Sequence, residues 1–183
     1  MLWSKFCNLQ PESNYIFSAI SVDIQRLAIL RYLARKHGYV GRDDQEQAKV
    51  DMVEQQVVDL HTAWGKAIWE PVGDPDAARA EFYDKTLHAH LELISKFMAN
   101  SKFLIADKLT YVDFYLFEVL STQLLLEPGC LDKYGNLKQY HERVANLPRL
   151  KEYLANYKET REAILKFLPH LNKKWAGKFQ LVP

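Results

Sequence analysis

The side chains of this sequence that could do chemistry are mostly histidines and carboxylates. His88 and His90 stand two residues apart on an expected helix, so their rings point to different faces and do not form a metal-binding pair. We expect both rings to be solvated. His61 follows Asp59 by two residues, and the same geometry separates that imidazole from that acid. No GxSxG, P-loop, GxGxxG or HExxH pattern occurs, so these residues alone predict neither a catalytic site nor a metal site.

The cysteines and the charge balance disfavour several further classes of protein. Cys7 and Cys130 lie far apart without a CxxC spacing, which argues against a zinc site or a disulfide scaffold and for a reducing cytosol. The 24 basic and 23 acidic residues nearly cancel, so nothing favours nucleic acid or an anionic membrane as a partner. No apolar run is long enough to cross a bilayer, and the first residues lack the pattern of a signal peptide. We therefore expect a soluble, cytoplasmic protein.

Helical periodicity runs through most of the chain and predicts a mainly α fold. Two long helices joined by a short Pro/Gly turn predict an antiparallel helical hairpin, whose second helix begins with Asp74 as N-cap and Pro75 in its first turn. Up to about residue 22 the pattern is poor, apart from a possible short strand at 15–17. The other predicted helices are 24–37, Asp44–Trp69, 107–126, 137–145 and 148–156.

The segment 107–126 carries the strongest local signal. Thr110 is followed three residues later by Asp113, which is a capping box in its aspartate form. The helix that follows is apolar on nearly every face, which predicts burial at the centre of its domain. We expect Thr110 and Asp113 to act in folding as a structural N-cap rather than in catalysis.

Five segments together resemble cytosolic glutathione S-transferases, and the mu class in particular. The resemblance covers about residues 25–157, with the capping-box segment as its most specific part. The segments are 25–37 (QRLAILRYLARKH), 53–59 (VEQQVVD), 106–114 (ADKLTYVDF), 127–132 (EPGCLD) and 136–148, which begins NLKQY and ends in Leu-Pro.

The resemblance implies a helical bundle like the C-terminal domain of that family, preceded by the remnant of a thioredoxin-like α/β domain. The implied boundaries are 1–40 for the glutathione-binding remnant and 43–183 for the all-α domain. The implied activity is conjugation of the glutathione thiol to hydrophobic electrophiles, with glutathione as co-substrate and no other cofactor. The implied assembly is a homodimer.

The family's catalytic tyrosine belongs to the first half of the thioredoxin-like domain, and Met1 starts too late in the pattern to include it. That hydroxyl stabilises the thiolate of glutathione. Asn14 also stands where the family carries a proline. We therefore predict no catalytic residue in this sequence and a conjugation activity that is weak or lost.

Other positions match the family's binding residues. Gln25 and Arg26 occupy the positions of a Gln-Ser pair that holds the γ-glutamyl end of glutathione, and Asp59 matches an acid that reaches glutathione on the other subunit. Trp3 and Lys5 match a Trp and a Lys that contact glutathione, although with a shorter spacing. A polar first helical turn and a solvated helix carboxylate are the structural alternatives for Gln25, Arg26 and Asp59.

The wall of the electrophile pocket is expected on the helix Asp44–Trp69. Trp69 falls where the family has a pocket-lining tyrosine, with His61 and Thr62 nearby on the same helix. An aromatic residue that only packs is the alternative for Trp69. For the whole chain the alternatives are a non-catalytic helical module for ligand binding or dimerisation, and an origin of residues 1–24 in altered splicing or a gene-model error.

Overall fold

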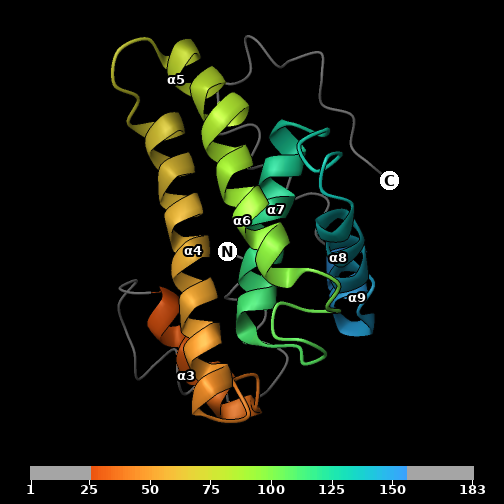
Figure 1. Ribbon diagram of the computed structural model, residues 1–183. Helices are drawn as coiled ribbons and strands as arrows, with labels where there is room; N and C mark the ends of the chain where they lie inside the picture. The colour runs from red at the N-terminus through yellow and green to blue at the C-terminus, as the bar shows by residue number, and fades with distance from the viewer. Residues whose placement is uncertain (1–25, 156–183) are drawn as a thin grey trace. The chain divides into compact units, whose positions relative to one another are not determined.

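The computed structural model describes residues 26–155 (Figure 1), and the prediction of a mainly α fold is confirmed there. Within this range no strand forms, and one isolated β-bridge joins Ile105 to Lys108. The chain divides into two units, Met1–His37 and Gly38–Pro183. The strand expected at 15–17 lies outside the described residues.

The described part of the first unit is helix α3, Arg26–His37. Its buried side chains Leu30, Leu33 and Ala34 lie at helical spacing on one face. Its last turn is basic, as expected next to the partial negative charge of a helix C-terminus. Gly38 follows with a φ of 74°, a left-handed conformation that favours glycine and ends the helix.

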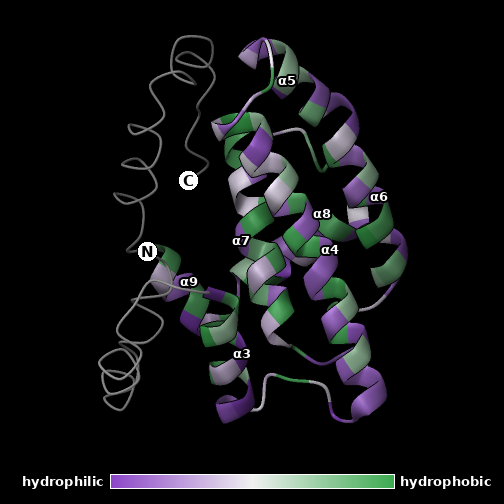
Figure 2. Cartoon of the chain, turned by 90° about the vertical axis from the view of Figure 1, so that its left-hand side faces the viewer, coloured by the Kyte–Doolittle hydropathy of each residue, from purple (hydrophilic) through white to green (hydrophobic). Residues whose placement is uncertain are grey.

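The second unit begins with the predicted hairpin, in which helix α4 (Asp44–Trp69) packs against helix α6 (Leu87–Met98) (Figure 1). Both helices are amphipathic, and hydrophobic residues alternate with hydrophilic ones along each of them in Figure 2. The buried face of α4 is formed mainly by apolar residues, as the periodicity predicted. They are Val50, Val53, Val57, Leu60 and Ile68, whereas Trp64, which was also expected on this face, is half-buried.

The second arm of the hairpin is interrupted, which the periodicity did not predict. Helix α5 (Pro75–Glu81) starts at Asp74 and Pro75 as expected, but a π-helical turn, η1 (Phe82–Thr86), separates it from α6. A π turn accommodates one extra residue and rotates the side chains that follow. Within α6, Met98 continues the buried positions Leu87, Leu91 and Ile94 at helical spacing, whereas Phe97 is 40% exposed.

Helix α7 (Tyr111–Leu126) lies between α4 and α8 and is buried on nearly every face (Figure 1). Its N-cap residue Thr110 and the N3 residue Asp113 form the capping box. The Asp113 carboxylate accepts hydrogen bonds from the backbone N–H groups of Thr110 (2.7 Å) and Leu104 (3.0 Å) and from the Thr110 hydroxyl (3.0 Å). Burial raises the pKa of Asp113, and these hydrogen bonds oppose that rise. The box therefore fixes both the start of α7 and the loop before it.

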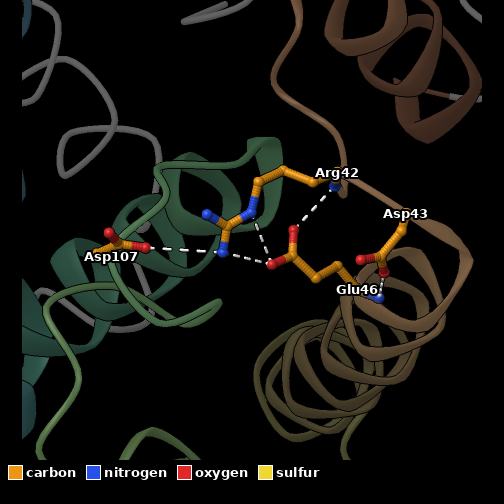
Figure 3. Close-up of polar contacts among 4 residues, drawn as sticks. All are labelled: Arg42, Asp43, Glu46 and Asp107. Carbon is orange, nitrogen blue, oxygen red and sulfur yellow. Dashed lines mark hydrogen bonds and ion pairs between the residues drawn. The ribbon is translucent and has the colours of Figure 1, made fainter.

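The segment before α4 is held by a cluster of charged residues (Figure 3). Asp43 caps α4 by accepting the N–H of Glu46 at 2.8 Å. The Glu46 carboxylate in turn accepts the backbone N–H and the side-chain Nε of Arg42, both at 2.8 Å. The Arg42 guanidinium also lies 3.7 Å from Asp107 in the loop before α7. Hydrogen bonding to Arg42 lowers the pKa of Glu46 to about 2.

The same segment contacts the N-terminus of α7. The carbonyl of Tyr39 accepts the N–H of Tyr111 at 3.0 Å, which satisfies a donor that has no partner inside the helix. Gly41 is required for close approach to α4, because a Cβ at this position would stand 2.4 Å from the backbone nitrogen of Gln47.

Two short helices, α8 (Gly135–Ala145) and α9 (Pro148–Ala155), follow α7.

No helix in the described part of the chain is long and apolar enough to span a membrane. Between residues 26 and 155 there is also no group of three or more His, Cys, Asp or Glu side chains that could hold a metal ion.

Candidate functional site

The residues expected to line an electrophile pocket lie on the C-terminal half of α4. Thr62 and Trp69 are seven residues apart, nearly two full turns, so they share one face of the helix. Thr62 is exposed, His61 beside it is half-buried, and Trp69 is 52% exposed. This stretch therefore presents a large aromatic surface next to two polar side chains. We call the surface formed by His61, Thr62, Gly65 and Trp69 the α4 wall.

A chain of aromatic contacts connects the α4 wall to the core. The hydroxyl of Tyr115, buried on α7, is hydrogen-bonded to Nδ1 of His61 at 3.1 Å. The His61 ring lies 5.8 Å from the ring of Trp64, and Trp64 meets Trp69 edge to face at 6.4 Å and 88°. Edge-to-face pairs at such distances are favourable because the ring quadrupoles complement each other. The exposed indole of Trp69 is thus supported from behind by ordered rings.

Trp64 and Tyr83 form a buried polar pair behind the α4 wall. The Trp64 Nε1 and Tyr83 Oη atoms are both buried, and neither reaches a partner with hydrogen-bond geometry among residues 26–155. Burial raises the pKa of Tyr83, while the nearby Trp64 N–H lowers it. Buried polar groups without a hydrogen-bond partner lower the free energy of unfolding. Tyr83 stands in the π turn η1, so this pair was not foreseeable from helical periodicity.

The residues expected to bind glutathione are only partly described. Arg26 is the first residue of α3 and its side chain is exposed. Asp59 is exposed on α4 and accepts a hydrogen bond from Gln55 at 2.8 Å. Trp3, Lys5 and Gln25, like Asn14, lie outside the described residues.

The two histidines that were expected to be solvated are instead half-buried in contacts between helices, so that expectation was wrong. His90 Nδ1 lies 2.6 Å from Nε2 of Gln56 on α4. His88 Nδ1 lies 3.2 Å from the hydroxyl of Tyr134, which itself donates to the carbonyl of His88 at 3.0 Å. Their partners are more than 30 residues away in sequence, which is why the local pattern did not reveal them.

Sequence reasoning also missed three residues of this region. Trp64 was expected only to pack on the buried face of the helix Asp44–Trp69, and Tyr115 was not considered. Gly65 was not considered, although a glycine inside a long predicted helix is a visible signal because it is costly there. Among the residues that the structure describes, none would lie within 4 Å of a Cβ at Gly65.

Comparison with protein families gives one clear match for the described domain. The model of the glutathione S-transferase C-terminal domain matches residues 58–157, which is more than half of the chain. That range includes α5, η1, α6, α7 and α8, together with the α4 wall.

Individual relatives agree with this match. Glutathione S-transferase Mu 1 of Oryctolagus cuniculus is 35% identical over 144 residues, covering 79% of this chain and 65% of the relative. Glutathione S-transferase Mu 2 of Homo sapiens is 33% identical over the same coverage. The solved structure of a pi-class glutathione S-transferase from Onchocerca volvulus superposes with a TM-score of 0.69 at 32% identity, covering 75% of this chain and 66% of that one. The chain thus spans about two thirds of the length of these relatives.

Proposed function

This chain belongs to the glutathione S-transferase family, with curated relatives of the mu class, and on that premise we propose that it binds hydrophobic electrophiles for glutathione transfer. The observation that carries the proposal is the α4 wall, where Trp69 is 52% exposed and backed by Trp64 and His61. Small-molecule sites typically combine aromatic surface with a few placed polar groups, and His61 and Thr62 supply such groups here. We place this function in the cytosol.

The proposed reaction is a substitution or addition by sulfur. In an addition, the π bond of the electrophile breaks and its electron pair takes up a proton from solvent. The thiolate of glutathione forms a C–S bond with an electrophilic carbon of the second substrate. When that carbon carries a halide, the halide leaves with the bonding electron pair, and the thiol proton passes to solvent. In this scheme the α4 wall holds the electrophile next to the sulfur, and holding the two reactants in place supplies much of the rate gain.

We assign the glutathione side of the site by resemblance to Gln25, Arg26, Trp3, Lys5 and Asp59. The exposed guanidinium of Arg26 can pair with a carboxylate of glutathione in a bidentate manner. The exposed carboxylate of Asp59 would reach the cationic amino group of glutathione held by the second subunit of a homodimer. For the 183-residue polypeptide by itself we propose weak or absent conjugation, because none of its residues matches the family's catalytic tyrosine.

Titration calorimetry with glutathione on the 183-residue polypeptide tests the glutathione side directly. We expect binding that is weakened in Gln25→Ala and unchanged in the control Gln139→Ala, since Gln139 is exposed on α8. The electrophile side is tested by quenching of tryptophan fluorescence with a chloronitrobenzene, which Trp69→Ala should weaken. Conjugation at a rate normal for the family would contradict the proposed loss of activity, and absence of both binding signals would contradict the function as a whole.

The second candidate is a non-catalytic module for ligand binding or dimerisation. It is favoured by exposed apolar side chains on the packed helices α4 and α6, namely Met52 (64% exposed), Leu93 (56%) and Phe97 (40%). This candidate predicts that hydrophobic ligands bind equally well with and without glutathione. Glutathione binding at sub-millimolar affinity that is lost in Gln25→Ala would decide against it.

A further inference from the structure

Gly65 lies inside α4, a helix of 26 residues, where no packing contact from residues 26–155 accounts for the absence of a side chain. A glycine in a helix interior loses more chain entropy on folding than alanine and is destabilising there. At Gly41 a Cβ would clash with the backbone, but at Gly65 a Cβ would meet no atom of the described part of the chain within 4 Å. The backbone of α4 is therefore open to close approach at this point, which is one of the uses of glycine next to a ligand.

The open space over Gly65 is bordered by the other members of the α4 wall. His61 and Thr62 precede Gly65 by four and three residues, and Trp69 follows it by four, so all three are its neighbours on the helix surface. Side chains of a helix lean toward its N-terminus, which directs the Trp69 indole toward Gly65. Nevertheless no atom of that indole lies within 4 Å of where a Cβ would stand. Trp69 is 52% exposed, so part of its indole surface beside this space is accessible to a ligand.

One cation stands at the edge of this space. Lys66 follows Gly65 directly, precedes Trp69 by three residues and is exposed. Among the described residues Lys66 takes part in no ion pair, although Glu70 stands four residues further on and is also exposed. Lys66 is thus available to an anionic group of a bound molecule.

We propose that the α4 wall selects planar aromatic electrophiles that carry a carboxylate, with the ring over Gly65 against Trp69 and the carboxylate paired with Lys66. This assignment rests on the proposed function and adds to it a substrate class and two residues that determine specificity. The competing account of Lys66 is a basic residue that complements the C-terminal end of α4, and it predicts no preference among ligands.

The test compares two ligands that share a ring and a leaving group. They are 4-chloro-3-nitrobenzoate, which is anionic, and 4-chloro-3-nitrobenzamide, which is neutral. Binding to the 183-residue polypeptide is measured without glutathione, by tryptophan fluorescence quenching and by calorimetry, so that the result does not depend on conjugation activity. We expect the benzoate to bind about two- to fivefold more tightly, as an exposed charge pair allows, and the preference to shrink at high salt.

Three variants and one control variant separate the contribution of Lys66 from that of the space over Gly65. Lys66→Gln should abolish the preference for the benzoate while leaving the affinity for the benzamide unchanged. Lys66→Arg, which keeps the positive charge, should retain the preference for the benzoate. Lys49→Gln is the matched control, because Lys49 is an exposed lysine of the same helix about 25 Å away along its axis. Gly65→Leu should weaken both ligands by filling the space, and its far-UV circular dichroism should match that of the unchanged chain.

Equal binding of the two ligands, or an equal loss of both in Lys66→Gln, overturns the inference while leaving the proposed function standing. A Gly65→Leu variant that is folded and binds both ligands normally also overturns it. If neither ligand binds to the unchanged chain, the proposed electrophile site fails and the inference fails with it.

Discussion

His61 on α4 and Tyr115 on α7 are 54 residues apart in sequence, yet Nδ1 of the imidazole lies 3.1 Å from the phenolic oxygen. Tyr115 is buried, whereas His61 is half-buried at the edge of the α4 wall. The hydrogen bond therefore anchors a surface residue of the candidate site to the central helix of the domain. It also fixes the ring against which Trp64 packs.

The first prediction concerns this anchor. Tyr115→Phe keeps the ring and its packing but removes the hydroxyl, so we expect the free energy of unfolding to fall by about 0.5–1.5 kcal/mol. Because His61 loses its hydrogen bond to Tyr115, quenching of tryptophan fluorescence by an aromatic electrophile should also weaken. Chemical denaturation and ligand titration measure the two effects. Tyr32→Phe on α3 is the control, since Tyr32 is 42% exposed and its change should stay within about 0.5 kcal/mol.

The second prediction compares the effect of alanine on the free energy of unfolding at two glycines, Gly65 and Gly41. Gly65→Ala should raise the free energy of unfolding by about 0.5–1 kcal/mol, because alanine is the better helix former and its Cβ meets no atom within 4 Å. Gly41→Ala should lower it by about 2 kcal/mol, since its Cβ would overlap the backbone of Gln47. Thermal and denaturant unfolding of the two variants provide the comparison. Destabilisation by Gly65→Ala would show that the space over Gly65 is filled.

Local signals determined how much of the fold could be predicted. Helix α4 has the predicted bounds, because Asp43 caps its start and Pro71 follows its end. Helix α7 starts at Tyr111, four residues later than the predicted segment 107–126, and this start agrees with the expected N-cap Thr110, whose contact with Asp113 spans only three residues. The π turn η1 was missed, since a single inserted residue hardly alters a hydrophobic pattern of period 3.6.

The candidate site was predictable only in part, because local sequence patterns do not encode contacts between distant segments. Resemblance to a family identified Trp69 and the neighbouring polar residues of α4, which lie close together in sequence. The support that they receive from Tyr115 is a contact between distant segments, and no local pattern encodes such a contact. The contacts of His90 with Gln56 and of His88 with Tyr134 are of the same kind.

The third prediction concerns acid sensitivity at the contact between α4 and α6. Burial lowers the pKa of His90 below 6.5, and the charge of Asp59 opposes this. The unfolded chain therefore takes up a proton at His90 before the folded chain does, so stability falls as the pH drops through 6.5. His90→Gln should remove part of the loss of stability between pH 7.5 and pH 5.5. Urea titrations at both pH values measure it, and an unchanged pH dependence would rule out this role for His90.

The fourth prediction concerns the capping box. The Asp113 carboxylate accepts three hydrogen bonds from N–H and O–H donors and is fully buried. In Asp113→Asn one carboxylate oxygen becomes an NH₂ group, which cannot accept, so at least one buried donor loses its partner. We expect the free energy of unfolding to fall by about 1–3 kcal/mol.

Asp132→Asn is the matched control for Asp113→Asn, since Asp132 is an exposed acid in a surface ion pair with Lys138 and should contribute less than about 1 kcal/mol. Ligand binding separates a folding role from a direct role in the site. Under conditions where Asp113→Asn remains folded, its affinity for an aromatic electrophile should equal that of the unchanged chain. The reason is that Asp113 stands near the N-terminus of α7, and none of the hydrogen bonds of its carboxylate involves a residue of the α4 wall. A selective loss of ligand affinity in fully folded Asp113→Asn would contradict the assignment of this residue to folding alone.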